Sequence, residues 1–404
     1  MRKWAWRQTT RYATSAACHI VRHKGTVPPR MASSAAALRD AARQLLGSIT
    51  LHEYLASRPP SHVVTIQESR NVGDALILLN RHRLLSAPVI SDSTGDVLGF
   101  FHVSNALSAF LEGVSPSLVR DGSQSTESKA DELCSAGQEF CNIPLRSLKY
   151  GHDGVLAYVS RCSTSLLDLV DTFMQQGNKH RLAVWDLLGE DDSGDAAMRV
   201  SSIVSQSDII RYLAKHGQLL GADKLTIRDI HGWCTAGGLV TTTGTTPALS
   251  AFATMAKEKC SAIGITSQEG RLCGNLSQSD LRGLTPDTWG RLALPCAQFL
   301  VEQHGVELPS GLALQPDMSD PSRPCVYCGV VRQGEQPGDV TSQYVVIVTV
   351  KTSSSLSAVL EAMALHAVHH VWVVDESMMP VNVLTPSDVL HLVAGGVGRL
   401  RAEK

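Results

Sequence analysis

The chain has 404 residues, with 36 Lys and Arg against 38 Asp and Glu, a formal net charge of −2 and 43% hydrophobic residues. The near-neutral balance argues against a broad basic surface for nucleic acid or for anionic membranes. No apolar stretch approaches the roughly 18–20 residues that a membrane-spanning helix needs. The apolar fraction is too high for a disordered chain, and the length favours two or more domains.

Residues 1–40 differ in composition from the rest of the chain. Asp40 is the first acidic residue, and the segment before it is rich in Arg, Ala, Ser and Thr. This composition is typical of an organelle transit peptide. A disordered basic tail, or a true start at Met31, are the alternatives. We leave this leader out of the predicted fold.

Four later segments repeat one pattern, a short strand followed by helix, strand, strand and helix. Each predicted first helix has apolar residues at positions i, i+3, i+4 and i+7, the spacing of one buried helix face. The predicted helix caps are Asn71, Ser165, Thr246 (with Pro247 in the first turn) and Ser355. A short apolar strand follows each helix, at Ala87–Ile90, Ala183–Trp185, Ala262–Ile265 and Val371–Val374.

The predicted organisation is therefore an α/β (α+β) fold of four tandem repeats. Its parts are a leader (1–40), repeat one (41–113), a linker insertion (114–142), repeats two (143–219) and three (220–286), a second linker insertion (287–340), repeat four (341–396) and a tail (397–404). Because each repeat is too small to bury a good core alone, we expect repeat one to pair with two, and three with four.

The second helix of three repeats opens with the same short motif, a Ser or Thr followed three residues later by Asp. The motif residues are Ser205 and Asp208, Ser277 and Asp280, and Thr385 and Asp388. At a single site this spacing indicates only a helix cap. Three occurrences at one structural position favour a nucleotide site, in which the hydroxyl and the helix N–H groups hold phosphate and the Asp accepts ribose hydroxyls.

Basic residues precede the second strand of two of these repeats. Repeat two has Lys179, His180 and Arg181, and repeat four has His369 and His370 at the positions of the last two. Their predicted role is to bind phosphate, although a solvated helix end is the alternative. In repeat one, His102 and Asn105 replace the hydroxyl residue and the Asp, so we expect its ribose site to be weak or empty.

No catalytic constellation is present in the sequence, which predicts that the protein is not an enzyme and needs no catalytic cofactor. Cys325 and Cys328 have the spacing of half a zinc site, but no second pair follows them. We interpret them as free thiols in a loop and predict no metal site.

The repeats resemble cystathionine-beta-synthase (CBS) domains. The motifs around Asp280, the segment Lys179–Asp186 and the segment Val368–Asp375 carry this resemblance. Four such domains in tandem look like the gamma regulatory subunit of the AMP-activated (sucrose-non-fermenting) protein kinase family.

This resemblance implies two paired Bateman modules in a disk, with nucleotide clefts around a central channel. It implies that AMP, ADP and ATP compete as regulatory ligands. In such a site Asp208, Asp280 and Asp388 would contact the ribose, with the motif hydroxyls beside them, and the basic residues would contact the phosphates. The implied partners are a kinase alpha subunit and a beta scaffold, with no nucleic acid and no membrane span. The implied location is cytoplasmic or nuclear, or a mitochondrion or plastid if residues 1–40 are a transit peptide. A stand-alone regulator of a metabolic or redox enzyme is the alternative function.

Overall fold

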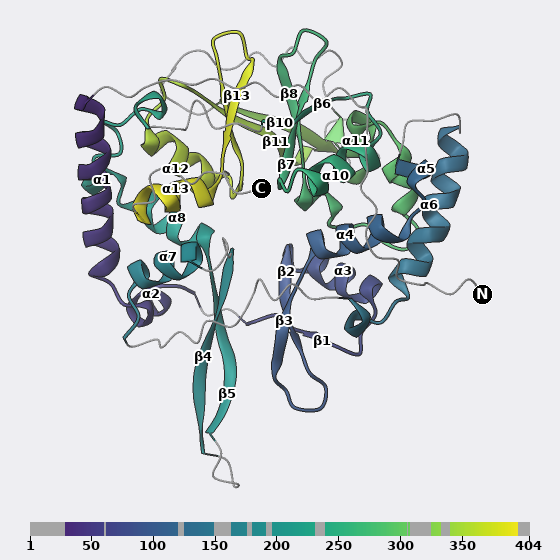
Figure 1. The fold of residues 1–404 in the computed structure, drawn as a ribbon, viewed down its shortest axis with the longest axis horizontal. Helices are drawn as coiled ribbons and strands as arrows, with labels where there is room; N and C mark the ends of the chain where they lie inside the picture. The colour runs from purple at the N-terminus through teal and green to yellow at the C-terminus, as the bar shows by residue number, and fades with distance from the viewer. Residues whose placement is uncertain are drawn as a thin grey trace.

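The structure is a computed structural model, and Figure 1 shows the four repeats arranged around a common centre in the order one, two, four, three. It describes residues 29–59, 62–119, 125–148, 163–175, 180–190, 196–230, 239–304, 306–307, 325–332 and 340–394. Lys179 lies outside these residues. None of the described helices is long and apolar enough to cross a membrane.

Repeat one shows the predicted order of elements. It consists of β1 (Ile66–Gln67), α3 (Val72–Arg81), β2 (Ser86–Ile90), β3 (Val97–His102) and α4 (Val103–Gly113). Strand β1 pairs with β2 in parallel, and β2 pairs with β3 in antiparallel orientation. A parallel connection needs a crossover, and α3 supplies it.

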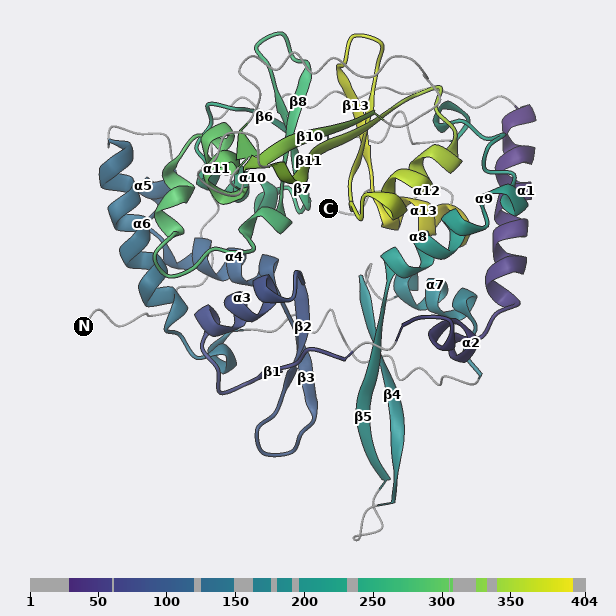
Figure 2. The ribbon, with the colours of Figure 1, turned by 180° about the vertical axis from the view of Figure 1, so that it is seen from behind.

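The other repeats follow the same plan, except that the described residues of repeat two include no first strand and the second helix of repeat three is replaced by a short turn. Repeat three has β6 (Thr241–Thr243), α10 (Ala248–Lys257), β7 (Ala262–Thr266) and β8 (Leu272–Ser277). Repeat four has β11 (Val340–Lys351), α12 (Leu356–Leu365), β12 (Val371–Val374), β13 (Pro380–Leu384) and α13 (Pro386–Ala394). Repeat two has α7 (Leu166–Gln175), β4 (Arg181–Glu190), β5 (Ala196–Ser205) and α8 (Gln206–Lys215). The β4–β5 hairpin extends well beyond the rest of the molecule (Figures 1 and 2).

Three of the four predicted helix caps are confirmed. The side chains of Asn71 and Ser355 accept from the backbone N–H three residues on, and the Ser165 hydroxyl accepts from the N–H of Asp168. The prediction for Thr246 is wrong by one residue, because α10 begins at Ala248 and Pro247 takes the cap position with no side-chain bond.

Repeat three also differs in its second helix. The motif opens only a four-residue 3₁₀ turn, η4 (Gln278–Leu281). Gly283 follows with φ +88°, a left-handed conformation that glycine adopts readily and that ends a helix. The chain then forms a second turn, η5 (Trp289–Ala293), and helix α11 (Cys296–His304).

Short segments exchange between the repeats of each pair. The elements α2 (Leu51–Ala56), η1 (Leu145–Ser147), η3 (Ile227–Asp229) and α11 each precede one repeat and bind the first helix of its partner. The contacts are isolated β-bridges: Thr50 with Ser165, Asn71 with Pro144, Thr226 with Ser355, and Pro247 with Pro295. The predicted pairs one–two and three–four are therefore joined reciprocally.

The large apolar cores add a second level of pairing that the sequence did not indicate. One core joins the helices and strands of repeats one and three, and the other joins those of repeats two and four. The fully buried Phe110 of α4 and Phe252 of α10 belong to the first core, and Phe173 of α7 and Val359 of α12 to the second. Each repeat thus completes its core with a helical neighbour outside its own pair.

Three predictions about the leader and the two insertions need correction. The fold begins before residue 41, because α1 (Pro29–Gly47) places Leu38 and Leu46 in the core of repeats two and four. The 114–142 insertion contains α5 (Pro116–Val119) and the 16-residue helix α6 (Thr126–Cys141). The second insertion contains η5, α11, β9 (Val306–Glu307) and β10 (Cys325–Arg332), so Cys325 and Cys328 lie in a strand rather than a loop.

Candidate functional site

The motif of repeat two forms a tight local network at the start of α8. Asp208 Oδ2 accepts from the backbone N–H of Ser205 at 2.7 Å and from its hydroxyl at 2.7 Å. The other carboxylate oxygen, Oδ1, lies 2.9 Å from Arg211 Nη1 and 3.4 Å from Arg58 Nη1. The Asp208 side chain is 5% exposed. The two arginines supply the positive charge that a buried carboxylate needs.

The motif of repeat three has the same arrangement with a different partner. Asp280 Oδ2 accepts from the Ser277 N–H at 2.6 Å and from its hydroxyl at 3.1 Å. Its Oδ1 lies 2.9 Å from Nε2 of His304, which α11 supplies from the second insertion. The Asp280 side chain is 2% exposed.

Repeat four has the most exposed of the three aspartates. Asp388 Oδ2 accepts from the N–H and the hydroxyl of Thr385, both at 2.7 Å. Asp388 is half-buried, whereas Asp208 and Asp280 are buried. Of the three motif aspartates, Asp388 therefore has the largest exposed fraction.

The capping geometry alone does not identify a ligand site. The same network of a hydroxyl, a backbone N–H and an acid recurs at Thr50 and Glu53, at Ser165 and Asp168, and at Thr226 and Asp229. What distinguishes the three motif aspartates is therefore their surroundings.

The predicted basic residues lie together at the centre of the molecule. Each of His180, Arg181 and His370 is close enough to His369 for their charges to interact, and Arg282 and Arg211 act on it as well. His180 and His369 retain exposed surface, and Arg181 is half-buried. Repeats two, three and four thus all contribute basic side chains to one basic centre, defined here as His180, Arg181, Arg282, His369 and His370.

Hydrogen bonds between repeats fix this centre. Arg181 Nη1 donates to the carbonyl of Ser86 in repeat one at 3.1 Å. His370 Nε2 lies 2.7 Å from the hydroxyl of Ser261 in repeat three. The Ser387 hydroxyl of repeat four donates to Gln206 Oε1 of repeat two at 2.8 Å. These bonds make the centre a junction of all four repeats.

Burial and mutual repulsion keep the imidazoles neutral. Desolvation, followed by neighbouring positive charges, lowers the pKa of His369 to about 4 and that of His370 to about 3. Desolvation also lowers the pKa of His180, although its surface remains accessible. The permanent charge of the centre consequently resides on the arginines, while neutral imidazoles can donate an N–H to an anion.

A family model described as "CBS domain" matches residues 53–112 and 338–395. The chain carries CBS domains. These matches cover repeats one and four, and repeats two and three show the same β-hairpin followed by the motif turn. No curated protein matches the chain.

The CBS arrangement also appears among solved structures. A protein of Methanocaldococcus jannaschii, described as a candidate archaeal homologue of γ-AMPK, is 16% identical, with 85% of this chain and 99% of that chain covered and a TM-score of 0.51. An uncharacterised conserved protein of Pyrococcus horikoshii is 14% identical, with a TM-score of 0.39. The match covers 82% of this chain and 96% of that chain. The first similarity shows the fold of the paired CBS modules.

The CBS repeats recruit residues that sequence reasoning missed. Arg58, Arg211 and His304 contact the motif carboxylates, yet only Arg211 lies beside its motif. Arg211, three residues after Asp208 in α8, could have been found from helical spacing. His304 could not, because it comes from an insertion that we expected to be a linker.

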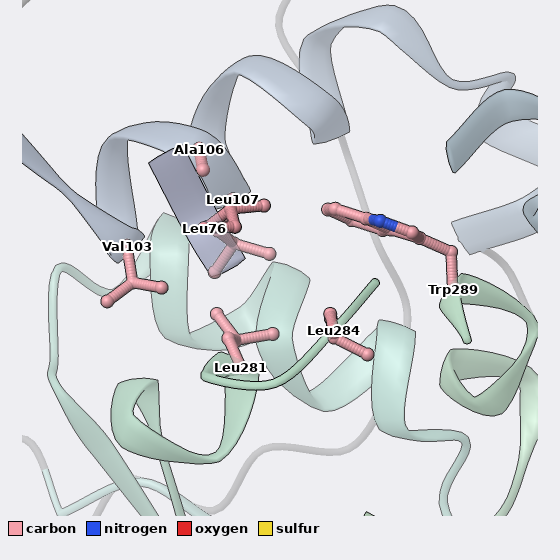
Figure 3. A pocket seen from close by; sticks show the side chains of 7 residues that line it. All are labelled: Leu76, Val103, Ala106, Leu107, Leu281, Leu284 and Trp289. Atoms are coloured by element: carbon pink, nitrogen blue, oxygen red, sulfur yellow. The ribbon is translucent and has the colours of Figure 1, made fainter. Parts of the chain in front are cut away.

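A separate recess lies between CBS repeats one and three and is apolar. Its lining includes Leu76, Leu107, Leu281 and Trp289 (Figure 3). The recess has a volume of about 10 Å³, room for at most one water molecule. This recess is part of the core and is too small for a nucleotide. Among the described residues no group of His, Cys, Asp or Glu could hold a metal ion.

Proposed function

We propose that this protein is a non-catalytic regulatory subunit that senses AMP, ADP and ATP for a Ser/Thr protein kinase of the AMP-activated type. The observation that carries the proposal is that two motif carboxylates lie near the basic centre: the charge of Asp208 acts on Arg181 and that of Asp280 on His370. The third motif is joined to the same region by the bond from Ser387 to Gln206. A nucleotide needs a diol acceptor and a cationic phosphate site at the same place, and the motif carboxylates beside the basic centre would supply both.

The proposed division of labour follows the geometry. His180, Arg181, His369 and His370 bind phosphate groups, and the sequence alone assigns Lys179 the same role. The motif carboxylates Asp208, Asp280 and Asp388 accept ribose hydroxyls, and the motif hydroxyls of Ser205, Ser277 and Thr385 hold those carboxylates in place. Because ligands would contact several repeats at once, binding would change the relative stability of their arrangements, which is how a regulatory module transmits a signal.

Calorimetric titration of the full chain with AMP, ADP and ATP tests nucleotide binding. Asp388→Asn should weaken AMP binding about tenfold, since it removes a charge-assisted acceptor but keeps a side-chain oxygen for the cap. Asp229→Asn is the matched control, because Asp229 makes the same capping contacts with Thr226 away from the basic centre. No binding to the unmodified chain at millimolar nucleotide would refute the proposal.

Co-purification identifies the partner. Recovery of a Ser/Thr kinase with a beta scaffold supports the kinase subunit. Recovery of a metabolic or redox enzyme would instead favour a stand-alone CBS regulator and overturn the kinase assignment.

A further inference from the structure

His102 occupies the position in CBS repeat one where the other repeats carry a motif hydroxyl. It is the last residue of β3 and the cap of α4, as Ser205 is for β5 and α8. His102 pairs across the hairpin with Ser86, just as Ser205 pairs with Arg181. The register therefore directs His102 to the same junction as the three motifs.

Local hydrogen bonds determine which nitrogen of His102 carries the proton. The backbone N–H of Ser104 donates to Nδ1 at 3.0 Å, and the Ser104 hydroxyl lies 2.7 Å from the same atom. An Nδ1 that accepts a hydrogen bond has no proton of its own. The neutral ring must then be protonated at Nε2, which leaves an N–H donor on its far side.

The neighbours of His102 belong to the basic centre. Arg181 donates to the carbonyl of Ser86, the cross-strand partner of His102. The charges of Arg181, His180 and His369 all act on the imidazole. Burial and these neighbours lower the pKa of His102 to about 3, so the ring is a neutral donor beside the permanent charge of Arg181.

We propose that His102 is an anion-binding residue whose Nε2–H donates to a phosphate group held at the basic centre. This inference depends on the location of the ligand site proposed above and extends that site to repeat one. The repeat that lacks the ribose motif would thus contribute to phosphate rather than to ribose. The terminal phosphates of a nucleotide and a free oligophosphate share this chemistry.

The test compares the full chain with His102→Ser, titrated calorimetrically with ATP and with inorganic pyrophosphate near neutral pH. Serine stands at this position in repeats two and three, so the variant keeps a helix-capping hydroxyl and loses only the imidazole. The affinity for both probes should fall about tenfold, the usual effect of losing a hydrogen bond to a charged group. His82→Ser, at the exposed end of α3, is the control and should bind as the unmodified chain does.

The outcomes separate this inference from the proposed function. Equal binding of both probes by His102→Ser and the unmodified chain overturns the role of His102 and leaves nucleotide sensing intact. If the unmodified chain binds pyrophosphate but neither ATP nor AMP, and His102→Ser loses this binding, adenine-nucleotide sensing is overturned and the anion-binding role of His102 is supported. Failure of pyrophosphate to bind the unmodified chain overturns the inference.

Nitrogen NMR of the histidines in the unmodified chain provides a measurement that needs no variant. An Nε2–H tautomer at His102 whose signal shifts on addition of pyrophosphate supports the proposal. A ring protonated at Nδ1, or a signal that does not move, overturns it.

Discussion

The substitution Gly137→Ala tests whether α6 is docked against η5. Gly137 is buried in the middle of α6, and a Cβ built there would lie 2.6 Å from Cδ1 of Trp289, with other atoms of that side chain closer still. Trp289 is 2% exposed, and its ring centroid is 4.1 Å from that of Phe110 and 5.5 Å from that of Phe140. The indole therefore has no free direction in which to move.

Two opposing effects determine the magnitude. Replacing glycine by alanine inside a helix stabilises it by about 0.5–1 kcal/mol. Forcing an extra carbon into a filled core costs about 1–3 kcal/mol, and the overlap at Gly137 is at the severe end. The net expectation is a loss of about 1–2 kcal/mol of unfolding free energy.

Urea denaturation of the full chain measures this change, with Ser135→Ala as control. Ser135 lies on the exposed face of the same helix, so alanine there should alter the unfolding free energy by less than about 0.5 kcal/mol. If Gly137→Ala stabilised the protein by the amount that helix propensity alone predicts, α6 would not contact Trp289. That result would contradict the packing of α6 against η5.

Two further predictions concern titration and reactivity. Acidification from neutral pH to about pH 5 should lower the unfolding free energy, because the folded pKa of His102 and His370 is about 3 whereas an unfolded imidazole titrates near 6.5. Between these two pKa values the unfolded chain binds more protons than the folded chain, so the unfolding free energy falls as the pH falls. The loss is up to about 1.4 kcal/mol per pH unit for each imidazole, before solvent screening reduces it. Urea midpoints that do not change between pH 7 and pH 5 would contradict this prediction. Five cysteines have side chains whose burial the structure describes, and among these Cys134 should be alkylated first by iodoacetamide. Cys134 is partly exposed whereas the other four are buried, and burial raises the pKa of Cys273 to about 11 and that of Cys296 to about 12. Peptide mapping by mass spectrometry checks the order, and earlier modification of Cys273 or Cys296 would show that their cores open readily.

Local patterns in the sequence predicted the repeating elements well. Helix α3 was predictable because Val72, Ala75, Leu76 and Leu79 lie on one face and Asn71 caps it, and all of this information is contained in one short segment. The same holds for the β-strands and for the motif turns. Periodicity and capping depend on neighbours in sequence, so one chain suffices to find them.

Contacts between distant segments were not predictable in this way. Trp289 and Gly137 come from two different insertions, and nothing near either residue in sequence indicates the other. The part of α1 before residue 41 belongs to the leader that the sequence analysis leaves out of the fold. In the structure, Arg39 Nε and Arg43 Nη1 of this helix donate to the carbonyls of Leu392 and Ala394 at the end of α13. A positive charge there is favourable because the end of a helix carries partial negative charge. These arginines thus bind the end of α13 within the fold.

The motif aspartates cap their turns with one oxygen, which leaves the other for the ligand role proposed above. In all three motifs Oδ2 caps the turn, so helix capping and ligand binding do not compete for the same atom. The proposed ribose contact would use Oδ1 instead. At Asp208 a ribose must replace Arg211 and Arg58, and at Asp280 it must replace His304. Since Asp388 is the most exposed of the three, the ribose site of repeat four should fill first.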